Sequence, residues 1–306
     1  MGRSAGPGAV IICEFLSRTT GKFMGNGRGC IATIVAAAGI AVALQVAAFA
    51  QAPAPAPVQT PSAGQPVAPP ARTPPPGYLS GDIDLLRVIP PAPQKGDARD
   101  EADRRIFRET RALQGSARWA MAADDAELGS AALLRHFSCS LDIELTPLQA
   151  PRMVAMLQKA TRDGAQAMLK AKDLYKRQRP YWVDEGPICR PRDELGNSFD
   201  YPSGHTTAGW TWAMALAQVA PERAIPILLR GRAIGDSRVV CGVHNASAVD
   251  AARLLTSATM ALVMATPAWQ ADVVEARAEL AALRSQPHAL PQPQRCEEEA
   301  RLIGMP

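Results

Sequence analysis

Aromatic residues and strand-like patterns are both scarce in this sequence. Aromatics make up 5% of the 306 residues, and no alternation of apolar and polar residues runs long enough to predict a strand. Alanine, the best helix former, is abundant, and runs of β-branched residues are few. The composition therefore predicts an all-α protein and argues against a β-sheet core.

A strong excess of charge is also missing. The formal net charge is +4, from 33 basic and 29 acidic residues. Residues 1–50 hold four of the basic residues and one of the acids, so the chain beyond them carries only about +1. Proteins that bind nucleic acid through their phosphates carry a basic surplus. We therefore expect no nucleic-acid partner.

Patterns typical of metal sites are missing as well. The chain has four histidines, its cysteines form no C-x-x-C pair, and its acids form no cluster with ligand spacing. We expect neither a metal nor another cofactor. Four cysteines remain beyond residue 50, an even number that predicts two disulfides in an oxidising compartment.

The first 50 residues resemble an export signal. An apolar run from Ile31 to Ala50 follows a basic region and ends in the small-x-small pattern at Ala48 and Ala50. We predict a signal peptide over residues 1–50, with Met24 as an alternative start and a retained membrane anchor as the alternative function of the run.

The remaining chain divides by composition into three parts. Residues 51–77 are rich in proline and alanine and predict an extended linker, 78–285 form the folded domain, and 286–306 form a proline-rich tail. No later run reaches the ~18 apolar residues that a membrane span needs. We expect a periplasmic or secreted protein whose mature form does not span a membrane.

Helical periodicity covers most of the folded domain. Expected helices are residues 99–113, a segment around Trp119, a segment ending near Cys139, Thr146 to just before Pro180, 204–219, 221–238, 248–265 and 269–283.

Two basic residues stand near the end of the long helix, in KDLYKRQRP. Lys172 and Arg179 are seven residues apart, so two turns of one helix would place them on nearly the same face, about 10 Å apart. Such a pair suits an anion. The alternative is a solvated basic helix end, where cations interact favourably with the helix dipole.

A second cluster opens the next helix, in YPSGHTTAGW. The free N–H groups of a first helical turn bind anions, Gly204 allows a close approach, and Ser203 can add its hydroxyl. His205 would stand at the mouth of that site. The alternative is a serine N-cap followed by a structural histidine.

A third cluster is SRVVCGVH. Arg238 can hold an oxyanion with two parallel hydrogen bonds, and His244 follows after five residues. The alternative for His244 is an exposed histidine at a helix end.

Together the patterns K-x6-R-P, P-S-G-H and S-R-x5-H resemble the type-2 phosphatidic acid phosphatase superfamily. Within it, residues 78–285 resemble the bacterial class A non-specific acid phosphatases. The resemblance implies an all-α helical bundle with the active site between core helices. It also implies an exported enzyme that hydrolyses small phosphate monoesters without a metal, and we leave open a homo-oligomer.

The resemblance also implies roles for individual residues. Lys172, Arg179 and Arg238 would hold the phosphoryl oxygens, and Ser203 and Gly204 would add hydrogen bonds. His244 would attack phosphorus to form a phosphohistidine. His205 would protonate the leaving alcohol and then activate water. Phosphoryl transfer requires this combination of charge compensation and in-line groups.

One position departs from the family pattern. The family places a carboxylate four residues after the nucleophile, where it bonds the second ring nitrogen, but this chain has Ala248. Asp250 is the next acid. We favour Asp250 as a helix cap, in a capping box with Ser247 as N-cap, since six helical residues would rotate it about 240° from His244. The other candidates to orient His244 are Asp250 itself, Ser247, a backbone carbonyl or a water.

Two rival functions follow from the same residues. Vanadium-dependent haloperoxidases bind vanadate with this constellation, and the missing acid at Ala248 would fit a catalytically impaired phosphate-binding protein. The cysteines add one structural prediction. Cys241 lies between Arg238 and His244, and Cys189 lies in the loop expected over the site. We therefore predict Cys189–Cys241, which leaves Cys139–Cys296 to hold the tail.

Overall fold

The computed structural model describes residues 76–81 and 83–304, so the predicted signal peptide and most of the predicted linker lie outside the described residues. The chain divides into two units, 1–67 and 68–306, and the described residues all belong to the second. The described part holds α-helices and short 3-10 turns and no strand, which confirms the all-α prediction. Its helices are α1 Ala98–Thr110, α2 Ala117–Asp124, α3 Ser130–Leu141, α4 Pro151–Tyr175, α5 Gly204–Val219, α6 Ala224–Val240, α7 Ala246–Met264, α8 Pro267–Arg284 and α9 Pro293–Ile303.

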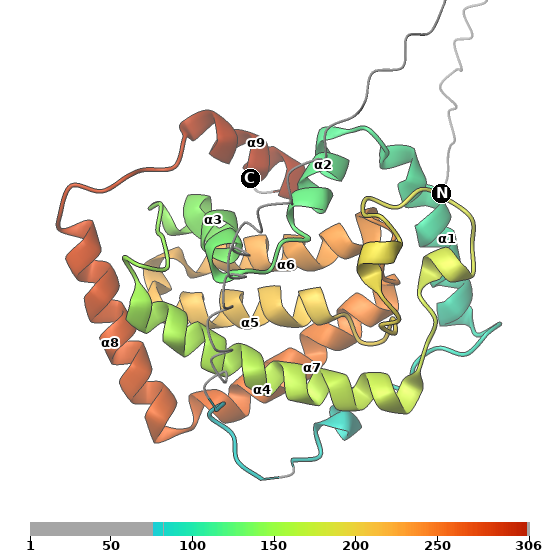
Figure 1. Ribbon diagram of the computed structural model, residues 1–306, viewed down its shortest axis with the longest axis horizontal. Helices are drawn as coiled ribbons and strands as arrows, with labels where there is room; N and C mark the ends of the chain where they lie inside the picture. Colours follow the sequence, from blue (N-terminus) through green and yellow to red (C-terminus); the bar gives the residue numbers. More distant parts are fainter. Residues whose placement is uncertain (1–75, 82, 305–306) are drawn as a thin grey trace, which may run out of the picture. The chain divides into compact units, whose positions relative to one another are not determined.

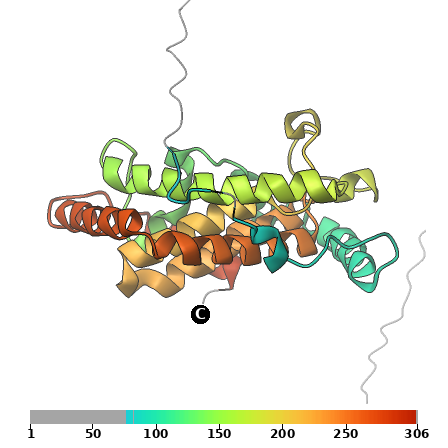
Figure 2. The ribbon, with the colours of Figure 1, turned by 90° about the horizontal axis from the view of Figure 1, so that it is seen from below.

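Helix α5 is the centre of the bundle. It packs against α4, α6, α7 and α8, and lies side by side with α6 in Figure 1. Figure 2 shows α4 as an outer layer, with α5, α6 and α7 below it. Most residues of α5 are small or apolar, and buried residues lie on several sides of the helix, as expected of a helix in a core.

Glycines let α5 and α6 approach closely. A Cβ on Gly231 would stand 2.2 Å from the Cβ of Ala213, and one on Gly209 would stand 2.6 Å from Ile234. Neither position can hold a larger side chain without moving a helix. This close antiparallel contact aligns the first turn of α5 with the last turn of α6, and those are the turns that carry the P-S-G-H and S-R-x5-H patterns.

The predicted end of α4 was wrong. The helix ends at Tyr175 and not near Pro180, because Lys176 takes a left-handed conformation with φ 45° and its N–H bonds the Lys172 carbonyl at 2.9 Å. Arg179 is extended, as residues before proline usually are. Lys172 and Arg179 therefore do not share a helix face. The predicted start was also early, since Thr146 bonds Gln149 in a turn and the helix begins at Pro151.

The tail contains a helix that the sequence analysis missed. Its prolines suggested an irregular segment, but Pro293 occupies the first turn of α9, where a missing N–H costs nothing. Cys139–Cys296 joins this helix to α3, and Cys189–Cys241 joins the 183–203 loop to the end of α6. Both predicted disulfide pairings are thus confirmed.

Helix α7 has the length and composition of a membrane span, with a mean hydropathy of 1.2, and among the described helices it alone does. More than half of that window, 56%, is buried inside the protein. The helix packs against α4, α5, α6 and α8, as a core helix does.

Candidate active site

The three sequence clusters meet where four helices begin or end. Lys172 lies in the last turn of α4, Ser203 caps the start of α5, Arg238 lies in the last turn of α6, and His244 directly precedes the N-cap of α7. A backbone hydrogen bond joins the starts of α5 and α7, since the Ser203 N–H donates to the Ala248 carbonyl at 3.0 Å.

His244 is buried and held at both ring nitrogens. Its Nδ1 lies 2.9 Å from Oδ1 of Asp200, and its Nε2 lies 3.1 Å from Nη1 of Arg179. A carboxylate accepts and a guanidinium only donates, so the ring proton is on Nδ1 and the lone pair is on Nε2. Burial, and then Arg179 and Lys172, lower the pKa of His244 well below its ordinary value. The imidazole is therefore neutral, as a nucleophile must be.

Asp200 is the acid that the sequence analysis did not identify. It is fully buried directly before Tyr201 and the P-S-G-H pattern, 44 residues from His244 in the chain. Burial raises the pKa of Asp200 to about 6, against the opposite effects of Arg177 and of two hydrogen bonds from Asn245. The signal in the sequence was an acid adjoining a motif that otherwise carries none.

The two side chains considered as possible orienters of His244, Asp250 and Ser247, lie elsewhere. Asp250 has a side chain 57% exposed and pairs with Arg99 and Arg253. Ser247 donates its backbone N–H at 2.9 Å, and its hydroxyl, to Asp103 of α1. Asp200, rather than Asp250 or Ser247, contacts the ring.

The predicted capping box is also wrong. Helix α7 begins at Ala246, with Asn245 as N-cap, and Asn245 makes no side-chain cap because its amide donates to Asp200 at 2.8 Å. Asp103 accepts the free N–H of Ser247 instead, so the cap comes from another helix.

Three buried cations surround the space in front of His244: Lys172, Arg179 and Arg238. Burial and then Arg179 lower the pKa of Lys172 to about 8 and that of Arg238 to about 9. Arg238 is 0% exposed, and its Nε and Nη1 have no hydrogen-bond partner among the described residues. Buried donors without a partner, and buried charges of one sign, raise the free energy of the folded protein. Binding an anion between these groups would therefore be favourable.

His205 is half-buried at the start of α5. Its Nε2 lies 3.1 Å from the carbonyl oxygen of Ala126, which can only accept, so Nε2 carries a proton. Burial and then Arg238 lower the pKa of His205 to about 3. With no anion present the ring is neutral, and a bound dianion would raise its pKa.

Ser203 and Gly204 form the anion-binding turn. The Ser203 hydroxyl oxygen accepts from Thr206 N at 3.4 Å and from Thr206 Oγ1 at 2.9 Å, which is the N-cap expected as the alternative. Its own proton remains available to donate to a ligand. A Cβ on Gly204 would meet only Met168, at ordinary contact distance, so protein packing does not require glycine there.

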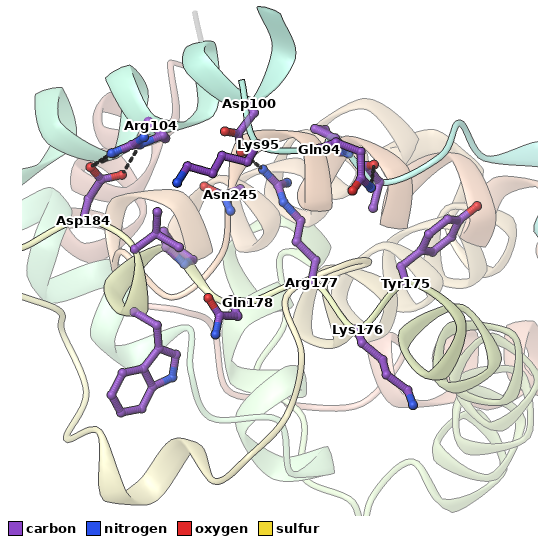
Figure 3. A pocket seen from close by; sticks show the side chains of 15 residues that line it. Gln94, Lys95, Asp100, Arg104, Tyr175, Lys176, Arg177, Gln178, Asp184 and Asn245 are labelled. Carbon is purple, nitrogen blue, oxygen red and sulfur yellow. Dashed lines mark hydrogen bonds and ion pairs between the residues drawn. The ribbon is translucent and has the colours of Figure 1, made fainter. Parts of the chain in front are cut away.

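A cavity of about 470 Å³ adjoins the support of Asp200 and is not itself the anion site. Arg177 and Asn245 line it, together with Lys95, Arg104 and Trp182 among others, but none of the seven predicted catalytic and phosphate-binding residues does. Figure 3 shows Arg177 directed toward Asp100, with Asn245 nearby. No group of histidine, cysteine or acidic residues within 76–81 and 83–304 is arranged to hold a metal ion.

Comparison with known proteins agrees with this geometry. The PAP2 superfamily model matches residues 155–272, from α4 into α8. An acid phosphatase of Zymomonas mobilis is 36% identical over 207 residues, which is 67% of this chain and 78% of that protein. A non-specific acid phosphatase of Providencia stuartii is 35% identical over 205 residues, 66% of this chain and 83% of that protein. One from Salmonella typhimurium is 36% identical over 195 residues, 63% and 78% respectively. The chain therefore belongs to the bacterial non-specific acid phosphatases of the PAP2 superfamily and is a phosphomonoesterase.

Proposed function

We propose that this acid phosphatase is exported and hydrolyses small phosphate monoesters through a phosphohistidine at His244, without a metal ion. The observation that carries the proposal is Arg238, fully buried with two unpaired nitrogens beside two other buried cations. An anion would accept from those donors and would also balance the three buried positive charges. The phosphoryl dianion has the required charge and three equatorial oxygens to distribute it.

The first half-reaction uses the lone pair on Nε2 of His244. As a phosphoryl group enters, Arg179 exchanges its contact with Nε2 for a phosphoryl oxygen. The Nε2–P bond forms while the bond from phosphorus to the ester oxygen breaks. The proton on Nδ1 stays with the ring and bonds Asp200, which stabilises the positive charge that the ring acquires.

His205 supplies the proton for the leaving alcohol. The bound dianion raises its pKa, so the ring takes a second proton on Nδ1, the nitrogen that Ala126 does not hold. That proton passes to the departing oxygen. In the second half-reaction the neutral His205 takes a proton from water, the water oxygen bonds phosphorus, and the N–P bond breaks to give inorganic phosphate and free His244.

Charge compensation comes from side chains and from a helix terminus. Lys172, Arg179 and Arg238 face the equatorial oxygens in a site with little water, where fixed charges act strongly. Ser203 and the first N–H groups of α5 add hydrogen bonds. This arrangement performs the electrostatic work that a metal ion performs in other phosphatases.

Export is supported by the two disulfides and by the signal-like residues 1–50, which lie outside the described residues. Structural disulfides persist in oxidising compartments such as the periplasm.

The test uses p-nitrophenyl phosphate at acid pH in the presence of EDTA. We expect turnover to persist in EDTA and orthovanadate to inhibit it. A denaturing quench with ³²P-labelled substrate should trap label on the wild-type protein and none on His244→Ala. Loss of activity in EDTA that a divalent metal restores would refute metal independence. Label retained by His244→Ala would refute the nucleophile. Bromide oxidation with vanadate and peroxide, without phosphatase turnover, would favour the haloperoxidase alternative.

A further inference from the structure

Position 248 cannot supply the carboxylate that the family pattern carries there. Ala248 is fully buried in an apolar cluster with Tyr201, Ala251 and Leu255. The side chain at this position therefore contributes to apolar packing and carries no charge. A phosphatase that forms a phosphohistidine still needs an acceptor for the second ring nitrogen of the nucleophile.

We propose that Asp200 is the positioning residue of His244, and that this chain supplies the carboxylate from the loop before α5 in place of the first turn of α7. The proposal rests on the proposed function of His244 as nucleophile. Its basis is the 2.9 Å contact between His244 Nδ1 and Asp200 Oδ1, with both groups fully buried.

The geometry allows the exchange because the two segments lie against each other. The Ser203 N–H donates to the Ala248 carbonyl at 3.0 Å, and the Asn245 N–H donates to Asp200 Oδ1 at 3.1 Å. Residues 200–203 and 245–248 therefore lie against each other beside His244. The family pattern takes its carboxylate from the second segment, whereas here Asp200 of the first segment contacts Nδ1.

The Asp200 carboxylate is fully occupied by hydrogen-bond donors. Oδ1 accepts from His244 Nδ1 and from the Asn245 N–H, while Oδ2 accepts from the Asn245 side chain at 2.8 Å and lies 3.5 Å from Arg177 Nη1. A carboxylate offers about four acceptor positions, and each is directed at one donor. This leaves the group no alternative orientation.

A further layer fixes the cation behind Asp200. Arg177 bonds Asp100 at 2.9 Å and Asp103 at 3.0 Å, both on α1, and bonds Ser247 at 2.7 Å. Arg177 therefore balances the Asp200 charge without being free to turn toward the phosphate. Such outer partners orient catalytic histidines in metal and protease sites by the same means.

The decisive variant is Asp200→Asn. An amide has one oxygen for four donors, so its NH2 must face either His244 and the Asn245 N–H, or Arg177 and the Asn245 amide. The first arrangement forces the ring proton onto Nε2, which removes the attacking lone pair, and the second places donors against a cation. We expect kcat to fall between about 10²- and 10⁴-fold. KM should change little, because the three phosphate-binding cations are intact.

The matched control is Asp163→Asn in the middle of α4. Asp163 is also buried, and it accepts the backbone N–H groups of Tyr78 at 2.8 Å and Leu79 at 3.2 Å. It lies about 13 Å along the helix axis from Lys172. This variant should lower the melting temperature and leave kcat unchanged. A loss of kcat in Asp200→Asn beyond that of the control, at equal folded fraction, separates positioning from folding.

A spectroscopic arm reads the position of the proton directly. Two-bond ¹H–¹⁵N correlation spectra distinguish the two tautomers of a neutral imidazole. Wild-type His244 should carry its proton on Nδ1, and Asp200→Asn should shift the ring toward the Nε2-H tautomer. This measurement does not require turnover. Its result for the wild type also does not depend on whether a variant folds. An Nε2-H tautomer in the wild-type protein would overturn the proposal.

Moving the carboxylate back completes the experiment. The double variant Asp200→Asn/Ala248→Asp should have a kcat at least about tenfold higher than that of Asp200→Asn. Ala248→Asp alone should not have a higher kcat than the wild type, because it buries a second carboxylate beside Asp200. A wild-type kcat in Asp200→Asn, or an Ala248→Asp variant faster than the wild type, would refute the role of Asp200. If the wild type traps phosphohistidine and Asp200→Asn traps it equally fast, this inference fails while the proposed function stands. If the wild type traps none, the proposed function fails.

Discussion

Arg238 gives the most informative single substitution, because its effects on stability and on activity should have opposite signs. The side chain is 0% exposed, and two of its three guanidinium nitrogens lack a partner among the described residues. Burial lowers its pKa from 12.5 to about 9. A cation whose pKa is lower in the folded protein destabilises that state whenever it is charged, which here includes every pH below about 9.

The magnitude follows from the pKa. A change from 12.5 to about 9 corresponds to roughly 5 kcal/mol at 1.36 kcal/mol per pKa unit, an upper bound for a buried group. Replacing buried charges by apolar residues of similar size commonly stabilises by about 1–4 kcal/mol. We expect Arg238→Met to gain about that much in phosphate-free buffer. It should lose at least about 10²–10³-fold in kcat/KM, because a phosphoryl oxygen is left uncompensated.

Urea unfolding with and without inorganic phosphate measures both sides of this balance. Phosphate should stabilise the wild type by RT ln(1 + [L]/Kd) and should stabilise Arg238→Met far less. The matched control is Arg230→Met on the same helix. Arg230 is equally buried but bonds Asp125 at 2.5 and 3.2 Å. Its removal leaves the buried Asp125 carboxylate without its cation and should lower the free energy of unfolding by about 3–5 kcal/mol. The reasoning is refuted if Arg238→Met is the less stable protein without phosphate, or if it keeps kcat/KM within tenfold.

Three further outcomes are expected. The pKa of His205, about 3 in the free enzyme, should rise by NMR titration when vanadate or phosphate binds, and an unchanged value would contradict its use as the acid. Cys139→Ser/Cys296→Ser should lower stability by about 2–5 kcal/mol in thermal melts but keep kcat at 25 °C, because the bond closes a long segment far from the site. Asp250→Asn should cost less than about 1 kcal/mol and keep kcat, since its pairing with Arg99 is exposed; a large fall in kcat would reassign it.

Short-range signals explain why the helices were predictable from the sequence. Helical periodicity and proline positions act within one or two turns, and they located eight of the helices within a few residues of their observed bounds. The same reliance on proline hid α9, since Pro293 reads as a breaker although it begins a helix. The end of α4 was missed because a left-handed Lys176 has no signal as strong as glycine.

The site residues that lie in contiguous sequence motifs could be predicted from the sequence, and the one that lies outside them could not. The seven residues predicted from the three clusters lie together in the structure, but Asp200 acts across 44 residues of chain. The argument from helical rotation correctly placed Asp250 away from His244, but its premise was wrong. It assumed a helix through His244 and Asp250, whereas α7 begins only at Ala246. Periodicity places residues within an element and says nothing about which loop folds over it.

The cations of the phosphate site also build the support for its nucleophile. Arg179 Nε donates to the Ser198 carbonyl at 2.7 Å, Lys172 donates to the Phe199 carbonyl, and the Asp200 N–H donates to the Arg177 carbonyl at 2.8 Å. These bonds fix three consecutive residues of the loop and thereby set the Asp200 carboxylate against His244. Substituting Lys172 or Arg179 would remove a phosphate contact and loosen the positioning residue together. Their kinetic effects therefore cannot be added to those of Asp200 as if the groups were independent, because binding site and nucleophile share one hydrogen-bonded segment.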